Sequence, residues 1–71
     1  MTRIPMDSSS IASVGYEPEK RLLEVEFVTG RLYEYAQVPE PIFRGLQEAE
    51  SAGRFFSTHI RSAGFPYRKL A

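Results

Sequence analysis

The sequence contains no cysteine and no asparagine, and it has only one histidine and one aspartate. Without cysteine, neither a disulfide bond nor a thiolate metal site can form, so the core alone must hold the fold. A Ser-His-Asp triad would require His59 and Asp7, which lie far apart and carry no local catalytic signature. Glycine-rich phosphate loops and metal-ligand spacings are also absent. We therefore expect no enzyme activity, no cofactor and no metal site.

Long apolar segments are missing as well. No run approaches the roughly 20 apolar residues that a membrane-spanning helix needs, and residues 1–5 lack the apolar region of a secretory signal peptide. These features predict a cytoplasmic protein without a membrane partner. The 71 residues correspond to one small domain, residues 1–71.

Charge is balanced overall but unevenly distributed. The formal net charge is zero, which is not typical of a protein that binds nucleic acid over its whole surface. Residues 1–51 carry five basic and nine acidic side chains, whereas residues 52–71 carry four basic and none acidic. The C-terminal segment is therefore the candidate for contacts with an anionic partner.

Alternating apolar and polar residues predict three strands. Residues 11–16 form the first run, residues 21–28 the second and residues 31–36 the third. Pro18 and its charged neighbours predict a turn between the first two. We expect an extended arm over residues 1–7, followed by a three-stranded antiparallel β-meander over residues 11–36.

The turn at Thr29-Gly30 decides which side chains share a face of the sheet. A two-residue turn would pair Val25 with Glu34, whereas a type I turn with Gly30 as a G1 bulge would pair Val25 with Tyr33. We favour the bulge because burial of one face sets the register. One face then carries Leu23, Val25, Phe27, Tyr33 and Tyr35, and the other carries Glu24, Glu26 and Glu34.

Two short helices are predicted after the sheet, over residues 40–61. Pro41 suits the first turn of a helix over residues 40–51, and a second helix covers residues 54–61. Gly45 weakens the first helix by about 1 kcal/mol relative to alanine, so either something packs closely there or the helix is marginal. Both helices should cover one sheet face, giving an α+β fold with a tail over residues 62–71.

The ordered pattern of residues resembles the KTSC domain family. The matching residues are Ser8, Ser9, Ile11, Gly15, Tyr16, the segment 23–27, Gly30, Tyr33, Tyr35, Val38, Pro39, Leu46, Ala49, Ser51, Gly53, Phe55, Phe56, Ile60, Arg61 and Tyr67. The resemblance spans roughly residues 3–70. One departure is Ser57, where asparagine is common. Because the family includes a region attached to some lysyl-tRNA synthetases, the resemblance implies RNA binding and brings no catalytic residues.

The basic and aromatic C-terminal segment is the candidate RNA-binding site. Its residues are Arg54, Phe55, His59, Arg61, Tyr67, Arg68 and Lys69. Arginine and aromatic side chains together suit looped or single-stranded RNA, and we expect a tRNA or another structured RNA as partner. The competing interpretation places Phe56 and Ile60 in the core and attributes the cations to helix C-termini. His59 is then expected either to cap the last turn of the second helix or to pack against Phe55.

A protein-interaction module is the alternative function. The glutamate face, with Glu24, Glu26 and Glu34, or an exposed edge of the strands at residues 11–16 and 31–36, would dock a basic protein or a second copy. We expect Lys20, Arg21 or Arg31, or else the basic surface of a partner, to offset the repulsion between the glutamates. Tyr33 and Tyr35 are predicted to be walls of the core rather than a stacking platform.

Overall fold

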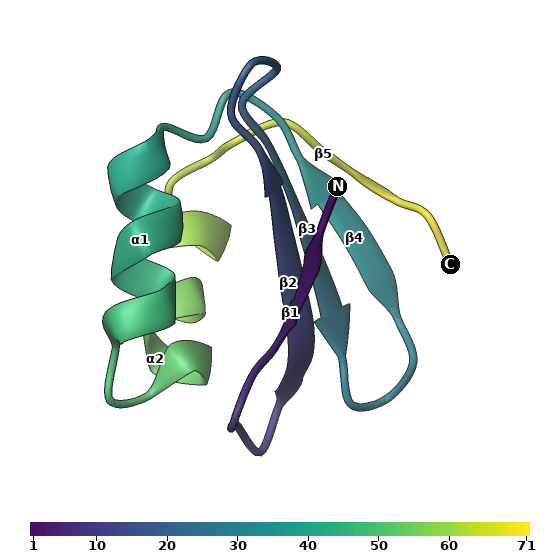
Figure 1. Cartoon of the computed structure of the whole chain (residues 1–71), viewed down its shortest axis with the longest axis vertical. Helices are drawn as coiled ribbons and strands as arrows, with labels where there is room; N and C mark the ends of the chain where they lie inside the picture. The colour runs from purple at the N-terminus through teal and green to yellow at the C-terminus, as the bar shows by residue number, and fades with distance from the viewer.

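In a computed structural model that describes residues 1–71, a five-stranded antiparallel sheet carries helices on one face only (Figure 1). The elements are β1 (Arg3–Pro5), β2 (Ile11–Glu17), β3 (Leu22–Phe27), β4 (Leu32–Tyr35), α1 (Glu40–Glu48), α2 (Ala52–Phe56), the π-helical segment η1 (Ser57–Arg61) and β5 (Tyr67–Lys69). The strands lie side by side in chain order, β1-β2-β3-β4-β5. The predicted α+β class is confirmed. None of the helices is long and apolar enough to span a bilayer.

The prediction of three strands was wrong, because the arm and the tail each add a strand. In β1, Ile4 pairs with Val14 of β2, and in β5, Tyr67 pairs with Tyr35 of β4. Each added strand has only three residues, too few to show an alternating pattern. Pro5 is compatible with β1 because proline is tolerated on an edge strand. All three residues of β5 are exposed, so the sequence shows no apolar periodicity from which this strand could be predicted.

The predicted register between β3 and β4 is confirmed. Leu23 pairs with Tyr35 and Val25 with Tyr33. Gly30 has a φ angle of +94°, and its N–H donates to the Phe27 carbonyl at 2.9 Å. The Phe27 N–H in turn donates to the Arg31 carbonyl at 2.9 Å. The G1 bulge therefore directs the apolar side chains of the hairpin toward the helices.

The core lies between the sheet and the helices. Its fully or almost fully buried members are Ile11, Val14, Leu23, Val25, Tyr35, Val38, Leu46, Ala52, Phe56 and Ile60. Phe56 meets both Phe27 and Tyr35 edge to face, with ring centroids 5.3 and 5.5 Å apart. These contacts hold the end of α2 against the β3–β4 hairpin.

Gly45 allows close packing between α1 and α2, one of the two options that the sequence left open. A Cβ atom at Gly45 would lie 2.6 Å from Cζ of Phe55. The helix boundaries differ from the predicted ones. α1 ends at Glu48 because Ala49 is extended, and α2 begins after Ser51, whose side chain accepts the Arg54 N–H at 3.2 Å.

Replacing Gly30 with alanine tests the bulge. An L-residue pays about 1–2 kcal/mol for a left-handed conformation, so Gly30→Ala should lower the free energy of unfolding by about that amount in urea denaturation. Nothing lies within 4 Å of an added Cβ, so the loss would come from the backbone alone. The neighbouring Thr29→Ala should change stability by about 0.5 kcal/mol or less. Equal tolerance of both changes would contradict the bulge.

Candidate functional site

An open cleft of about 820 Å³ lies where the β3–β4 hairpin meets the end of η1 and the segment that leads to β5. Its lining consists of Ser9, Ser10, Phe27, Val28, Thr29, Arg31, Tyr33, Tyr35, Arg61, Gly64, Phe65 and Tyr67. The volume is typical of a ligand-binding cleft, for which about 300–1,000 Å³ is usual. We call this site the aromatic cleft.

Tyrosines from two adjacent strands form one wall of the aromatic cleft. Cross-strand pairing places Tyr67 of β5 beside Tyr35 of β4, with ring centroids 5.6 Å apart. Tyr33 lies 6.1 Å from Tyr67 and 6.4 Å from Tyr35, and Phe27 meets Tyr33 edge to face at 6.0 Å. Tyr67 remains 66% exposed. The wall thus offers aromatic faces on which a planar group can stack.

The polar groups of the cleft are donors rather than carboxylates. Arg31 and Arg61 are in the lining, and no aspartate or glutamate is. The Arg61 guanidinium lies 5.5 Å from the centre of the Phe56 ring, within the range of a cation–π contact. Burial raises the pKa of Tyr35, and Arg61 acts in the opposite direction, so the tyrosine hydroxyl is a protonated donor at neutral pH. The cleft therefore suits a planar group that carries negative charge.

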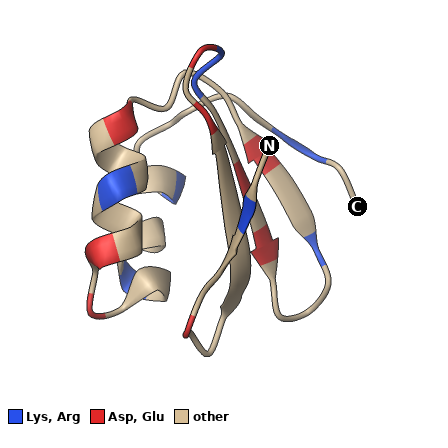
Figure 2. Cartoon of the chain, viewed as in Figure 1, with Lys and Arg blue, Asp and Glu red and all other residues tan.

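Because side chains alternate along a strand, the glutamates of β3 and β4 (red in Figure 2) lie on the opposite face of the sheet from the tyrosines. No helix packs on that face (Figure 1). The register aligns one residue from each strand in a single row: Arg3, Gly15, Glu24, Glu34 and Arg68. Arg3 Nη2 lies 2.7 Å from Glu24 Oε1, and Arg68 Nε lies 3.0 Å from Glu34 Oε1. We call this arrangement the charge row. It contains two cations and two anions.

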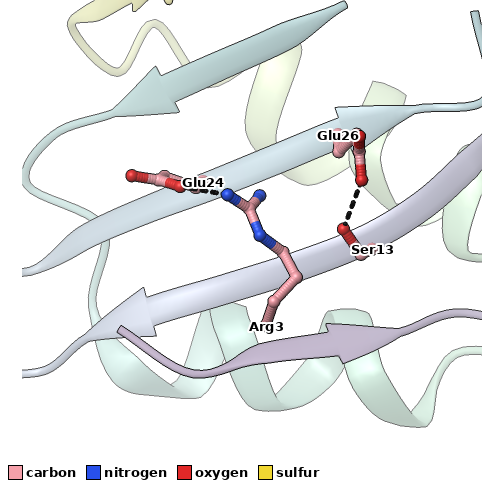
Figure 3. Close-up of polar contacts among 4 residues, drawn as sticks. All are labelled: Arg3, Ser13, Glu24 and Glu26. Carbon is pink, nitrogen blue, oxygen red and sulfur yellow. Dashed lines mark hydrogen bonds and ion pairs between the residues drawn. The ribbon is translucent and has the colours of Figure 1, made fainter. Parts of the chain in front are cut away.

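Gly15 is the one member of the charge row without a side chain. Arg3 reaches from β1 across β2 to Glu24 of β3 (Figure 3). A Cβ atom at Gly15 would lie 2.8 Å from the Met1 sulfur. Beside the row, Glu26 Oε1 accepts a hydrogen bond from the Ser13 hydroxyl at 2.8 Å (Figure 3).

The prediction of which basic side chains pair with the glutamates was wrong. Their ionic partners come from the edge strands β1 and β5, not from Lys20, Arg21 or Arg31. This pairing could not be anticipated because neither edge strand was predicted. It leaves the glutamate face largely neutralised within the chain.

Comparison with known proteins places the chain in a family. Residues 7–65 match the model of the KTSC domain. The chain belongs to the KTSC domain family. The crystal structure of a KTSC domain protein from Yersinia pestis superposes with a TM-score of 0.92 at 40% sequence identity, covering 99% of this chain and 97% of that one.

Two further relatives span this KTSC domain. An uncharacterised protein of Stutzerimonas stutzeri is 41% identical over 70 residues, which is 99% of each chain. A lysine–tRNA ligase of Nostoc sp. is 35% identical over 65 residues, or 92% of this chain but 11% of the ligase. The family predicted from the sequence is thus confirmed.

The structure separates the residues of the candidate RNA-binding segment. Arg61 and Tyr67 lie in the aromatic cleft, and Lys69 pairs with Tyr33 on the cleft side of β5. Arg68 lies on the opposite face, bound to Glu34. The remaining members, Arg54, Phe55 and His59, lie on α2 and η1 outside the cleft. Phe55 and His59 pack together with ring centroids 4.4 Å apart, which is one of the two alternatives that the sequence left open for His59.

Sequence reasoning missed most of the cleft. Tyr35 is a wall of the core as predicted, with 6% exposure, whereas Tyr33 is half-buried and lines the cleft together with Phe27, Phe65 and Arg31. The sequence feature that could have indicated the cleft was the pair of alternating tyrosines in β4. It could not be recognised as part of a cleft without the knowledge that β5 pairs with β4 beside them. No group of three histidine, aspartate or glutamate side chains is arranged to hold a metal ion.

A double-mutant cycle tests the charge row. Exposed ion pairs contribute about 0.2–1 kcal/mol, and Glu24 is only 19% exposed. We expect Arg3→Ala and Glu24→Ala to show a coupling energy near the upper end of that range in urea denaturation, decreasing in high salt. The Glu40–Arg44 pair on α1, with both side chains well over half exposed, is the matched control and should couple more weakly. Coupling no stronger for Arg3 and Glu24 than for this control would contradict the expectation.

Proposed function

We propose that this KTSC domain is a non-catalytic accessory module that binds RNA, either tRNA or another structured RNA, at the aromatic cleft. The observation that carries the proposal is the combination of neighbouring tyrosine rings and two arginines, without a carboxylate, in one open cleft. Aromatic side chains stack on unpaired bases, and arginine binds phosphate through a planar fork of donors. With this role we propose a cytoplasmic location.

The distribution of charge supports the cleft rather than the rest of the surface. The net charge is zero, so the protein has no general attraction for a polyanion. Arg3 and Arg68 are engaged in the charge row. Arg31 and Arg61 in the cleft have no carboxylate within ion-pair distance. Lys69, on the cleft side of β5, adds a third cation near the tyrosine wall.

The relatives also support RNA as the ligand. Proteins named lysine–tRNA ligase contain a region similar to 92% of this chain. That region amounts to 11% of the ligase, which agrees with an accessory rather than a catalytic role. We extend from these relatives to this chain only the expectation that the domain contacts RNA.

The alternative proposal, a protein-interaction module, has less support. Glu24 and Glu34 are paired with arginines of the same chain, and Glu26 accepts a hydrogen bond from Ser13. The edges of β2 and β4, which the sequence left open, are covered by β1 and β5. A basic protein or a second copy would have to displace these contacts or use the three-residue edge strands.

Fluorescence anisotropy with labelled tRNA tests the proposal. We expect binding at about 50 mM salt that weakens steeply toward about 200 mM, as counterion release requires. Arg61→Ala should weaken binding about tenfold and lower the salt slope by about 1. The matched control is Arg54→Ala, on the exposed side of α2, which should leave affinity unchanged.

Because Arg61 also contacts Phe56, Arg31→Ala serves as a second variant. Arg31 is exposed on the hairpin, so its removal should spare the fold and still weaken binding. No binding of tRNA, or of any other RNA class, at low salt would overturn the proposal.

A further inference from the structure

Tyr35 is a buried residue whose hydroxyl makes no hydrogen bond within the protein. The residue is 6% exposed, and its ring is wedged between Phe56 and Tyr67. No hydrogen bond joins its hydroxyl to another protein group, whereas the Tyr16 hydroxyl donates to the Val38 carbonyl. Since no fully buried side-chain nitrogen or oxygen lacks a partner, the Tyr35 hydroxyl must open into the cleft that the residue lines.

A free hydroxyl donor in an aromatic cleft favours one class of ligand. Tyr67, which is 66% exposed, offers a ring face beside Tyr33, and the nearly buried Tyr35 offers a hydroxyl to the same cleft. A purine or pyrimidine has both a flat face that can stack and acceptors on its edge. Arg61, at the end of η1 in the same lining, can bind the attached phosphate. The parts of the cleft thus match the parts of a nucleotide.

Base pairing would prevent this mode of binding. In a duplex, the faces of a base are covered by its neighbours and its pairing edge is occupied. The cleft is walled by β4 and β5 on one side and by the segment around Arg61 and Phe65 on the other. A base can reach Tyr35 only if it leaves the stack.

We infer that the aromatic cleft holds an unpaired nucleotide of an RNA strand, with its base stacked on Tyr67 beside Tyr33, a base acceptor on the Tyr35 hydroxyl, and its phosphate on Arg61. The inference rests on the proposed RNA-binding function and specifies its ligand. Loops, bulges and single-stranded ends of RNA are the sources of such a nucleotide.

Affinities for three probes test the inference. The probes are a labelled single-stranded RNA octamer of mixed sequence, the same octamer annealed to its complement, and uridine monophosphate as an unlabelled competitor. We expect the single strand to bind at least about tenfold more tightly than the duplex. Because a stacked base loses about 1–3 kcal/mol on alanine substitution, Tyr67→Ala should weaken single-strand binding by about 5- to 150-fold.

Two matched pairs of variants separate recognition from stability. Tyr35→Phe removes only the free hydroxyl and should weaken binding by about 2- to 12-fold. Tyr16→Phe removes a hydroxyl bonded to Val38 outside the cleft, so it should leave RNA affinity unchanged. Tyr67→Phe, which keeps the ring, should retain the affinity that Tyr67→Ala loses. Leu70→Ala, also exposed in the tail, is the control for that site.

The failures of the inference and of the proposed function are distinguishable. Equal binding of single strand and duplex, or unchanged affinity in both Tyr35→Phe and Tyr67→Ala, would overturn the inference and leave RNA binding intact. Uridine monophosphate that binds as tightly as the octamer would overturn it too, because the ligand would then be a free nucleotide. Absence of binding to every RNA would overturn both.

Discussion

The bulge at Gly30 is the constraint on which the two faces of the sheet depend. Because side chains alternate along a strand, a shift of one residue between β3 and β4 would exchange every side chain of β4 between the faces. Gly30, with a φ angle of +94°, pairs Val25 with Tyr33 and Glu24 with Glu34. The tyrosines therefore face the helices and form the cleft, and the glutamates face away. Both the candidate site and the charge row follow from this single turn.

The edge strands complete what the hairpin begins. β5 contributes to both faces through consecutive residues, because Tyr67 joins the tyrosine wall and Arg68 binds Glu34 on the far side. β1 supplies Arg3 to the other end of the charge row. Like charges that face each other on adjacent strands, such as Glu24 and Glu34, destabilise a sheet. Each glutamate is paired with an arginine from an edge strand, which offsets the repulsion between the two carboxylates and links both edge strands to the hairpin.

The sequence was sufficient to predict the elements whose apolar side chains are buried at regular intervals. It was insufficient to predict the short strands that bury little. The hairpin, its register and the two helices could be predicted because burial of apolar side chains decides them. β1 and β5 were missed because three exposed residues carry no such pattern. The candidate site was consequently placed along the chain from Arg54 to Lys69, whereas the cleft joins Tyr33 of β4 to Arg61 and Tyr67. Local periodicity does not predict which distant segments of the chain pair with each other.

Chemical-shift mapping by NMR shows directly whether RNA binds in the aromatic cleft or elsewhere on the protein. The protein, isotopically labelled and at low salt, would be titrated with the unlabelled single-stranded octamer. We expect shifts concentrated on Tyr35, Arg61, Phe65 and Tyr67, with the far face of the sheet unchanged. Shifts concentrated on Glu24 and Glu34 instead, or on the exposed side of α2, would contradict it.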